Sequence, residues 1–258
     1  APCSACAGSG RPTAARGAMA ATAARKLVLP ALLAVRCCAL TAGLRRAHPP
    51  LSRPLSAASS AAADAAPKKT ALVPIADGSE EIEAVGIIDT LVRGGIDVTV
   101  ASVMPSTTVT CSRGVRLVAD ALLADVASRD YDAVALPGGM PGAEHLRDCE
   151  PLRDLLLRQQ ARGGVIAAIC AAPAVVLHAH GITAGRTATC YPAEGFRKAL
   201  GEAAAVAPDE RRVVVDGSLV TSQGPGTALE MALKLVEVLR GPEVAAGVGG
   251  AMLVQGDK

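Results

Sequence analysis

The sequence predicts an α/β domain over residues 68–258, with a mostly parallel β-sheet covered by helices on both faces. One observation is that short apolar runs alternate with longer amphipathic segments, the order expected of strands joined by crossover helices. A second is the run 164–173, in which a buried strand ends at Cys170 and a helix begins near Pro173. This run places a cysteine at a strand-to-helix turn, the arrangement called a nucleophile elbow.

The first half of the domain is predicted to contain a strand, a helix, a second strand and, further on, a third strand, at Thr70–Ala76, Ser79–Arg93, Ile96–Ala101 and Ala133–Leu136. The helix has an apolar side formed by Ile82, Val85, Ile87 or Ile88, and Leu91. Gly94 and Gly95 follow it, as expected at a helix C-terminus. Residues 109–118 are predicted to form a hairpin or an excursion from the sheet.

The second half is predicted to contain three helices, at Pro151–Arg162, Pro173–His180 and Thr227–Arg240, of which the last is the final helix of the chain. A buried strand is expected at Val165–Ile169 and a short one at Thr187–Cys190. Two further strands, Val213–Val215 and Leu219–Ser222, are joined at Asp216-Gly217 as a hairpin.

Four segments follow the carboxyl ends of predicted strands, and we expect them to meet at one edge of the sheet: residues 77–83, 138–142, 170–172 and 223–226. Ligands of such sheets bind outside this edge. The glycine-rich loop 138–142 has neither the spacing of a dinucleotide-binding loop nor a phosphate-binding lysine. Its glycines either place backbone N–H groups near an oxyanion or only make tight turns.

Cys170 is interpreted as a reactive thiol, since the start of a helix favours the thiolate; the alternative is a small core residue. Glu83 lies one helical turn after Glu80, and we expect it to face inward with a raised pKa, able to shuttle a proton. Glu80 and Glu81 are interpreted as favourable charges at a helix N-terminus. The domain has three histidines, His145, His178 and His180, and none lies where a cysteine–histidine pair would need it. The sequence therefore favours a cysteine–carboxylate site.

The first 67 residues are predicted to be a targeting segment and a disordered linker. They carry eight Lys/Arg and one acid, a net charge of +7, which leaves −5 for residues 68–258 of a chain whose total is +2. This composition is typical of an organellar transit peptide, directed to a mitochondrion or a plastid. A secretory signal at Leu27–Val35 and a cytoplasmic location are the alternatives, and Met19 is a candidate start. The apolar stretch is too short to span a bilayer.

Several classes of function are not supported by the composition of the domain. Its Lys/Arg residues are scattered and its only aromatic residues are Tyr131, Tyr191 and Phe196, so we expect no nucleic-acid partner. No metal-ligand spacing or cofactor motif is present, so we expect neither a metal nor a cofactor. The cysteines of the domain are widely spaced and are predicted to be free thiols in a reduced compartment: Cys111, Cys149, Cys170 and Cys190.

Four motifs in this order resemble the ThiJ/PfpI superfamily, in its branch of protein deglycases and cofactor-independent glyoxalases: residues 76–83, 136–139, 167–173 and 221–227. The resemblance covers nearly all of residues 69–254. It implies a flavodoxin-like sandwich, a homodimer and a reactive cysteine in strained backbone geometry.

The resemblance also implies roles for particular residues. Cys170 would be the nucleophile and Glu83 the acid that is hydrogen-bonded to it, and the backbone amides of Gly139 and Ala171 would stabilise an oxyanion. Tyr191, Arg113 and Arg93 would be pocket residues, the arginines near the entrance and the dimer interface. Some members carry a histidine where this chain has Tyr191, so Glu83 is expected to carry the proton transfers here.

The function expected from this resemblance is that of a glyoxalase without a cofactor. It would convert methylglyoxal or glyoxal to a hydroxy acid through a hemithioacetal on Cys170. The same first step would serve a deglycase acting on glycated protein side chains. The alternative is a redox-sensing protein or chaperone of oxidative stress, in which Cys170 is oxidised to a sulfinate.

Overall fold

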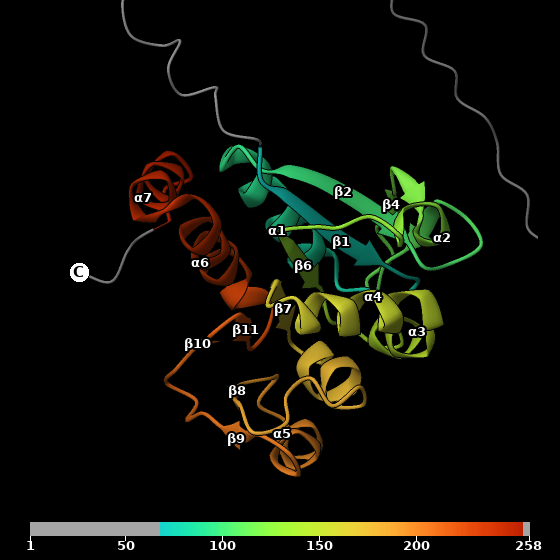
Figure 1. The fold of residues 1–258 in the computed structure, drawn as a ribbon, viewed down its shortest axis with the longest axis vertical. Helices are drawn as coiled ribbons and strands as arrows, with labels where there is room; N and C mark the ends of the chain where they lie inside the picture. Colours follow the sequence, from blue (N-terminus) through green and yellow to red (C-terminus); the bar gives the residue numbers. More distant parts are fainter. Residues whose placement is uncertain (1–67, 255–258) are drawn as a thin grey trace, which may run out of the picture. The chain divides into compact units, whose positions relative to one another are not determined.

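The structure is a computed structural model that describes residues 68–254, so the expectations for residues 1–67 lie outside the described residues. A seven-stranded sheet has the order β10-β11-β7-β6-β1-β2-β5 (Figure 1). All neighbours are parallel except β10 and β11. The strands are β1 Thr70–Ile75, β2 Asp97–Ser102, β5 Ala121–Leu122, β6 Ala133–Leu136, β7 Val165–Ile169, β10 Val213–Asp216 and β11 Leu219–Ser222. The predicted α/β architecture is confirmed.

Helices cover both faces of this sheet and bury two separate apolar clusters. On one face lie α1 (Glu81–Arg93) and α6 (Ala228–Arg240), which pack against each other (Figure 1). On the other lie α3 (Gly142–Asp148), α4 (Glu150–Ala161) and the short helix η1 (Pro173–Leu177). The central strands β6 and β7 are almost entirely buried, as their unbroken apolar sequences require. Within residues 68–254, no helix is both long and apolar enough to cross a membrane.

The structure contains helices and two strands that the sequence reasoning missed: α2 (Leu123–Val126), α3, α5 (Glu194–Gly201), α7 (Pro242–Ala251), β5 and β9 (Ala205–Val206). The prediction that the helix at 227–240 is the last one is therefore wrong. Helix α7 begins directly after Gly241, which has φ +94°. Its sequence is mostly alanine, glycine and valine, which gives weak helical periodicity and explains why it was missed.

Two small two-stranded sheets lie outside the main sheet, and they contain the hairpin expected at 109–118 and the short strand expected at 187–190. Strands β3 (Thr108–Thr110) and β4 (Arg116–Val118) form the predicted hairpin, and β8 (Thr187–Ala188) pairs with β9. The helix expected at 173–180 is a five-residue π-helix, in which the His178 amide donates to the carbonyl of Pro173 at 3.0 Å.

The buried side of α1 differs from the apolar side expected from the sequence. Ile82 and Val85 are 60% and 45% exposed. The inward face instead combines Ile87 and Leu91 with the fully buried carboxyl group of Glu83. Helical spacing alone did not reveal this rotation, because it follows from polar partners that Glu83 finds at the ends of other strands.

Candidate active site

The strand-end segments meet in contacts too close for any residue but glycine. A Cβ atom at Gly138 would lie 2.6 Å from the Cβ atom of Cys170. A Cβ atom at Gly139, which has φ +87°, would lie 2.4 Å from the carbonyl oxygen of Gly78. The Glu80 amide also donates to the Gly138 carbonyl at 3.0 Å. The loops after β1, β6 and β7 therefore form one packed unit.

Cys170 follows β7 and has φ +63°, one of only two non-glycine residues with positive φ in residues 68–254. Such a conformation is strained for a residue with a Cβ atom, and it is held here by backbone hydrogen bonds on both sides. The Cys170 amide donates to the Ser222 carbonyl at 3.0 Å, and the Tyr191 amide donates to the Cys170 carbonyl at 2.8 Å. The predicted elbow is present.

Glu83 lies behind Cys170 with its carboxyl group fully buried. Its Oε2 accepts a hydrogen bond from the Gly138 amide at 2.7 Å, whereas the buried Oε1 has no hydrogen bond of standard geometry. Burial raises the pKa of Glu83 to about 7; hydrogen bonds from Gly138 and the Cys170 thiol act in the opposite direction, and the Glu80 charge raises it further. Because Oε2 faces an N–H donor, Oε1 is the oxygen that can hold a proton.

The environment of the sulfur differs from the expectation that a helix dipole sets its charge. Burial raises the pKa of the Cys170 thiol to about 12, and the Glu83 charge acts in the same direction. Hydrogen bonds from the amides of Gly139 and Ala171 act in the opposite direction. Glu83 and Cys170 therefore disfavour two negative charges, and the nucleophilic thiolate requires that Glu83 hold the proton.

A cavity of about 320 Å³ opens above the sulfur. Of the predicted residues it brings together Cys170, Gly139, Ala171, Arg113 and Tyr191. Five further residues of its wall were not predicted individually: Glu80, Ser112, Met140, Phe196 and Pro225. Glu80, Met140 and Pro225 belong to strand-end segments that were expected at this edge of the sheet. No motif marks Ser112 or Phe196, although Phe196 is the only phenylalanine of the chain.

Arg93 is not part of this cavity, so its interpretation as a pocket residue is wrong. It lies in the last turn of α1, ten residues after Glu83 and thus about 15 Å further along the helix axis. Its side chain is exposed, and Nε donates to Asp89 at 2.8 Å. None of the histidines in residues 68–254 lines the cavity either, which agrees with a cysteine–carboxylate site.

Glu80 and Glu81 do more than place charge at the start of α1. Glu80 Oε2 caps the helix by accepting from the Glu83 amide at 2.7 Å. Glu81 accepts from the Ser112 hydroxyl at 2.9 Å and from the Arg113 amide at 2.8 Å. Burial acts to raise the pKa of Glu81, but hydrogen bonds from its own amide and from this loop lower it overall. Glu81 thus holds the loop that brings Arg113 to the cavity.

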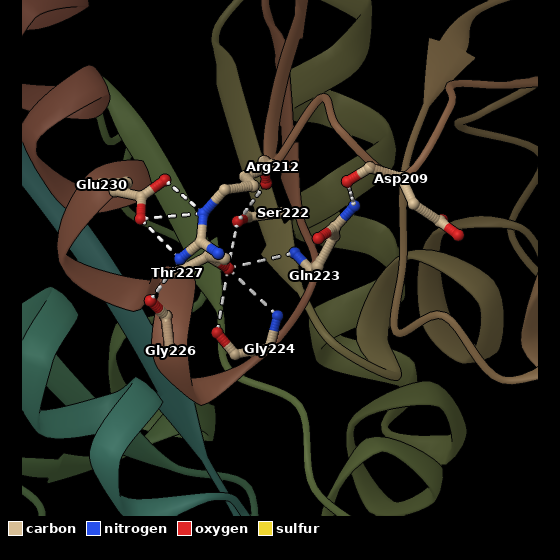
Figure 2. Close-up of polar contacts among 8 residues, drawn as sticks. All are labelled: Asp209, Arg212, Ser222, Gln223, Gly224, Gly226, Thr227 and Glu230. Atoms are coloured by element: carbon tan, nitrogen blue, oxygen red, sulfur yellow. Dashed lines mark hydrogen bonds and ion pairs between the residues drawn. The ribbon is translucent and has the colours of Figure 1, made fainter. Parts of the chain in front are cut away.

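The loop after β11 is held by a second polar network, which is centred on Arg212, Ser222 and Thr227 (Figure 2). The Ser222 hydroxyl donates to the Arg212 carbonyl at 2.8 Å and lies 2.6 Å from the Thr227 hydroxyl. The Arg212 guanidinium donates to the Gly226 carbonyl at 2.8 Å and to Glu230 at 2.7 Å. Because the Ser222 carbonyl accepts from Cys170, this network fixes the strand end that supports the elbow.

Within residues 68–254, no three His, Cys, Asp or Glu side chains lie close enough to hold a metal ion. The four cysteines there are free thiols, and two of them, Cys111 and Cys190, are buried. Burial raises the pKa of each of these two thiols to about 11. Cys170 differs from both in lining a cavity beside a carboxyl group.

Comparison with known proteins gives the same family throughout. The model of the DJ-1/PfpI family matches residues 69–238. The chain is 45% identical over 187 residues to Protein DJ-1 homolog B of Arabidopsis thaliana, covering 72% of this chain but 42% of that relative. It is 41% identical over 184 residues to Glutathione-independent glyoxalase DJR-1.2 of Caenorhabditis elegans, covering 69% of this chain and 92% of that one.

A solved structure of oxidised DJ-1 from Toxoplasma gondii is 47% identical, with a TM-score of 0.68 over 72% of this chain and 98% of that one. This neighbour confirms the flavodoxin-like fold.

Proposed function

Because the chain belongs to the DJ-1/PfpI family, whose model covers residues 69–238, we propose that it is a cofactor-independent glyoxalase acting on methylglyoxal or glyoxal. The observation that carries the proposal is the pair of Cys170 and buried Glu83 beneath a cavity, with the amides of Gly139 and Ala171 directed at the sulfur. The relative from Caenorhabditis elegans that bears the name glyoxalase supports it.

The reaction would begin with addition of the Cys170 thiolate to the aldehyde carbon. The sulfur–carbon bond forms as the carbonyl electron pair moves onto oxygen, which then takes the proton from Glu83 Oε1 and gives a hemithioacetal. The amides of Gly139 and Ala171 lie beside the sulfur, where they can stabilise the developing negative charge on that oxygen.

Glu83, now ionised, would remove the hydrogen from the former aldehyde carbon. The electron pair forms a carbon–carbon double bond, and the ketone oxygen takes the proton that Glu83 has just removed, which gives an enediol. Glu83 then removes the proton of the hydroxyl group on the first carbon and passes it to the second carbon, which gives a thioester of the 2-hydroxy acid. Water cleaves the carbon–sulfur bond of this thioester and restores the thiol. The sum is aldehyde plus water to hydroxy acid, with no external oxidant or reductant.

The test is lactate formation from methylglyoxal by purified full-length protein without added thiols. We expect turnover by the wild type and none by Cys170→Ser, whose fold is checked by its melting temperature. Equal consumption of methylglyoxal by both proteins would overturn the proposal. Release of lysine or arginine from freshly made methylglyoxal adducts tests the deglycase activity, for which the same first step is proposed.

A second candidate function is redox sensing at Cys170. Two peroxide molecules would convert the thiol to a sulfinate and leave as two waters. The favourable observation is that a protonated Glu83 and two amides surround this sulfur, a setting that would stabilise sulfinate oxygens. Mass measurement after mild peroxide treatment tests it. Addition of two oxygens at Cys170 by a protein that does not turn over methylglyoxal would favour the sensor.

We also propose that the protein is a homodimer that uses the outer face of α1. Ile82 and Val85 of α1 are apolar and exposed there. Leu229 of the neighbouring helix α6 lies beside Gly86 of α1. Together with Leu229, which is 37% exposed, Ile82 and Val85 form an apolar outer face that a second copy of the chain could cover. Sedimentation should give a dimer for the wild type and a monomer for Ile82→Lys, whereas a monomeric wild type would contradict the proposal.

A further inference from the structure

Two of the three aromatic residues of this chain lie side by side at the cavity. The sequence has no tryptophan, two tyrosines and one phenylalanine. Tyr191 and Phe196 meet edge to face, with ring centroids 6.4 Å apart and planes at 85°. Both line the cavity above Cys170, and Tyr191 is 44% exposed. Aromatic side chains are thus rare in this chain, and two of the three line this cavity.

The Tyr191 ring is held in place before any ligand arrives. Its backbone amide donates to the Cys170 carbonyl at 2.8 Å, which holds the backbone of Tyr191 beside the nucleophile. On one side the ring lies against Gly224, where an added methyl group would be 3.4 Å from Cδ2. On another side it meets Phe196, which is anchored in α5 and packs partly on the core. A preformed wall loses little entropy on binding.

The polar residues Ser112 and Arg113 approach Cys170 from one side of the sheet, and the aromatic residues approach it from the opposite side. Arg113 and Ser112 belong to the β3–β4 hairpin, which is bonded to the loop after β1. Tyr191 follows β8, whose next residue, Thr189, is bonded to Thr221 of β11. A ligand whose carbonyl carbon reaches Cys170 thus meets charge on one side and aromatic rings on the other.

The size of the cavity indicates which substituent the aromatic side receives. Its volume is about 320 Å³, which is more than the single methyl group of methylglyoxal fills. On the basis of the glyoxalase function above, we propose that the wall formed by Tyr191 and Phe196 selects 2-oxoaldehydes whose ketone carbon carries an aromatic or similarly bulky apolar group.

The first test compares phenylglyoxal with methylglyoxal as substrates of full-length protein. We expect a higher kcat/KM for phenylglyoxal, and about a tenfold fall in the ratio of the two values in Tyr191→Ala and in Phe196→Leu, mainly through KM. Tyr191→Phe keeps the ring and should retain the wild-type ratio. Leu157→Ala is the matched control, since Leu157 is 41% exposed on α4 and does not line the cavity.

The second test needs no turnover. Since the chain lacks tryptophan, Tyr131→Phe leaves Tyr191 as the only tyrosine emitter. Tyr131 is buried away from the cavity, where its hydroxyl donates to the Val126 carbonyl at 3.2 Å and also meets the Thr99 side chain. Mandelate, the product expected from phenylglyoxal, should change this emission at concentrations at which lactate does not.

The outcomes separate the two proposals. Turnover of methylglyoxal with an unchanged substrate ratio in Tyr191→Ala, and equal emission with mandelate and lactate, would overturn the aromatic selectivity and leave the glyoxalase function standing. Failure of the wild type to consume either aldehyde would overturn the function itself and the substrate assignment with it.

Discussion

The backbone amide of Gly138 donates a 2.7 Å hydrogen bond to Oε2 of Glu83, and Gly138 is the residue packed directly against Cys170. One glycine thus sets both the orientation of the acid and its distance from the thiol. With Oε2 occupied by an N–H group, the proton of Glu83 is confined to the oxygen available to the sulfur and the substrate.

The first prediction concerns this carboxyl group. Glu83→Gln has the same shape and keeps an oxygen for the Gly138 amide, but it cannot exchange a proton. We expect kcat for methylglyoxal to fall by roughly 10²–10⁴-fold, the usual contribution of general acid–base catalysis, with a smaller change in KM. Steady-state kinetics measure this. An unchanged kcat would exclude Glu83 as the group that moves the proton between carbons.

The second prediction is a pH dependence of stability. The pKa of Glu83 is about 7 in the folded protein against an ordinary value of 4.5, so the folded state holds this proton more tightly than the unfolded state. The resulting stabilisation is fully present below about pH 4.5 and is lost as the pH rises through 7. Relative to Glu83→Gln, the wild type should lose on the order of 2 kcal/mol between pH 5 and pH 8.

Urea denaturation of both proteins at the two pH values measures this difference, because contributions of all other groups are common to both. A difference that stays constant, or that grows with pH, would contradict the raised pKa of Glu83.

Local sequence was enough to predict the central strands and the elbow. Val165–Ile169 is a continuous apolar run ended by Cys170, and β7 has these bounds in the structure. For the strands and the elbow, neighbours along the chain carry the information. The inward position of Glu83 was also expected, although helical spacing had placed Ile82 and Val85 on the buried side of the same helix.

The walls of the cavity were not predictable in the same way. Ser112 and Phe196 reach it from a hairpin and a helix whose positions depend on tertiary packing. The prediction that Arg93 is a pocket residue failed for the opposite reason. Its helix was predicted correctly, but Arg93 lies in the last turn of that helix, far from the elbow. One feature of the sequence could have drawn attention to Phe196: it is the only phenylalanine in a chain that is poor in aromatic residues.

The third prediction uses two glycines with different surroundings. Gly138→Ala would place a methyl group 2.6 Å from the Cβ atom of Cys170 and 2.8 Å from the Ile169 carbonyl oxygen. Both neighbours belong to the elbow, so relief requires the elbow to move. We expect a loss of a few kcal/mol in unfolding free energy and of nearly all activity.

Gly247→Ala is its control, because nothing lies within 4 Å of the added atom in α7. It should raise the stability by up to about 1 kcal/mol without changing activity, since alanine favours the helix. Thermal unfolding and kinetics of the two variants measure both effects. Equal behaviour of the two variants would show that the close approach at Gly138 is not required.

The fourth prediction concerns Arg212, which touches no part of the cavity but holds the loop that supports Cys170. Arg212→Ala removes the bonds to the Gly226 carbonyl and to Glu230 (Figure 2). The ion pair is half exposed, so its own loss should cost no more than about 1 kcal/mol of stability. If Arg212 positions the elbow, kcat should nevertheless fall severalfold while KM changes little.

Two further variants separate positioning from a general loss of surface charge. Arg212→Lys should not restore kcat, because an ammonium group cannot bind Glu230 with two nitrogens while reaching Gly226. Arg153→Ala removes a comparable surface pair with Asp154 on α4, and it should leave kcat at the wild-type value. The positioning role is wrong if Arg212→Ala and Arg153→Ala have the same kcat, since the elbow would then be rigid without the network around Ser222.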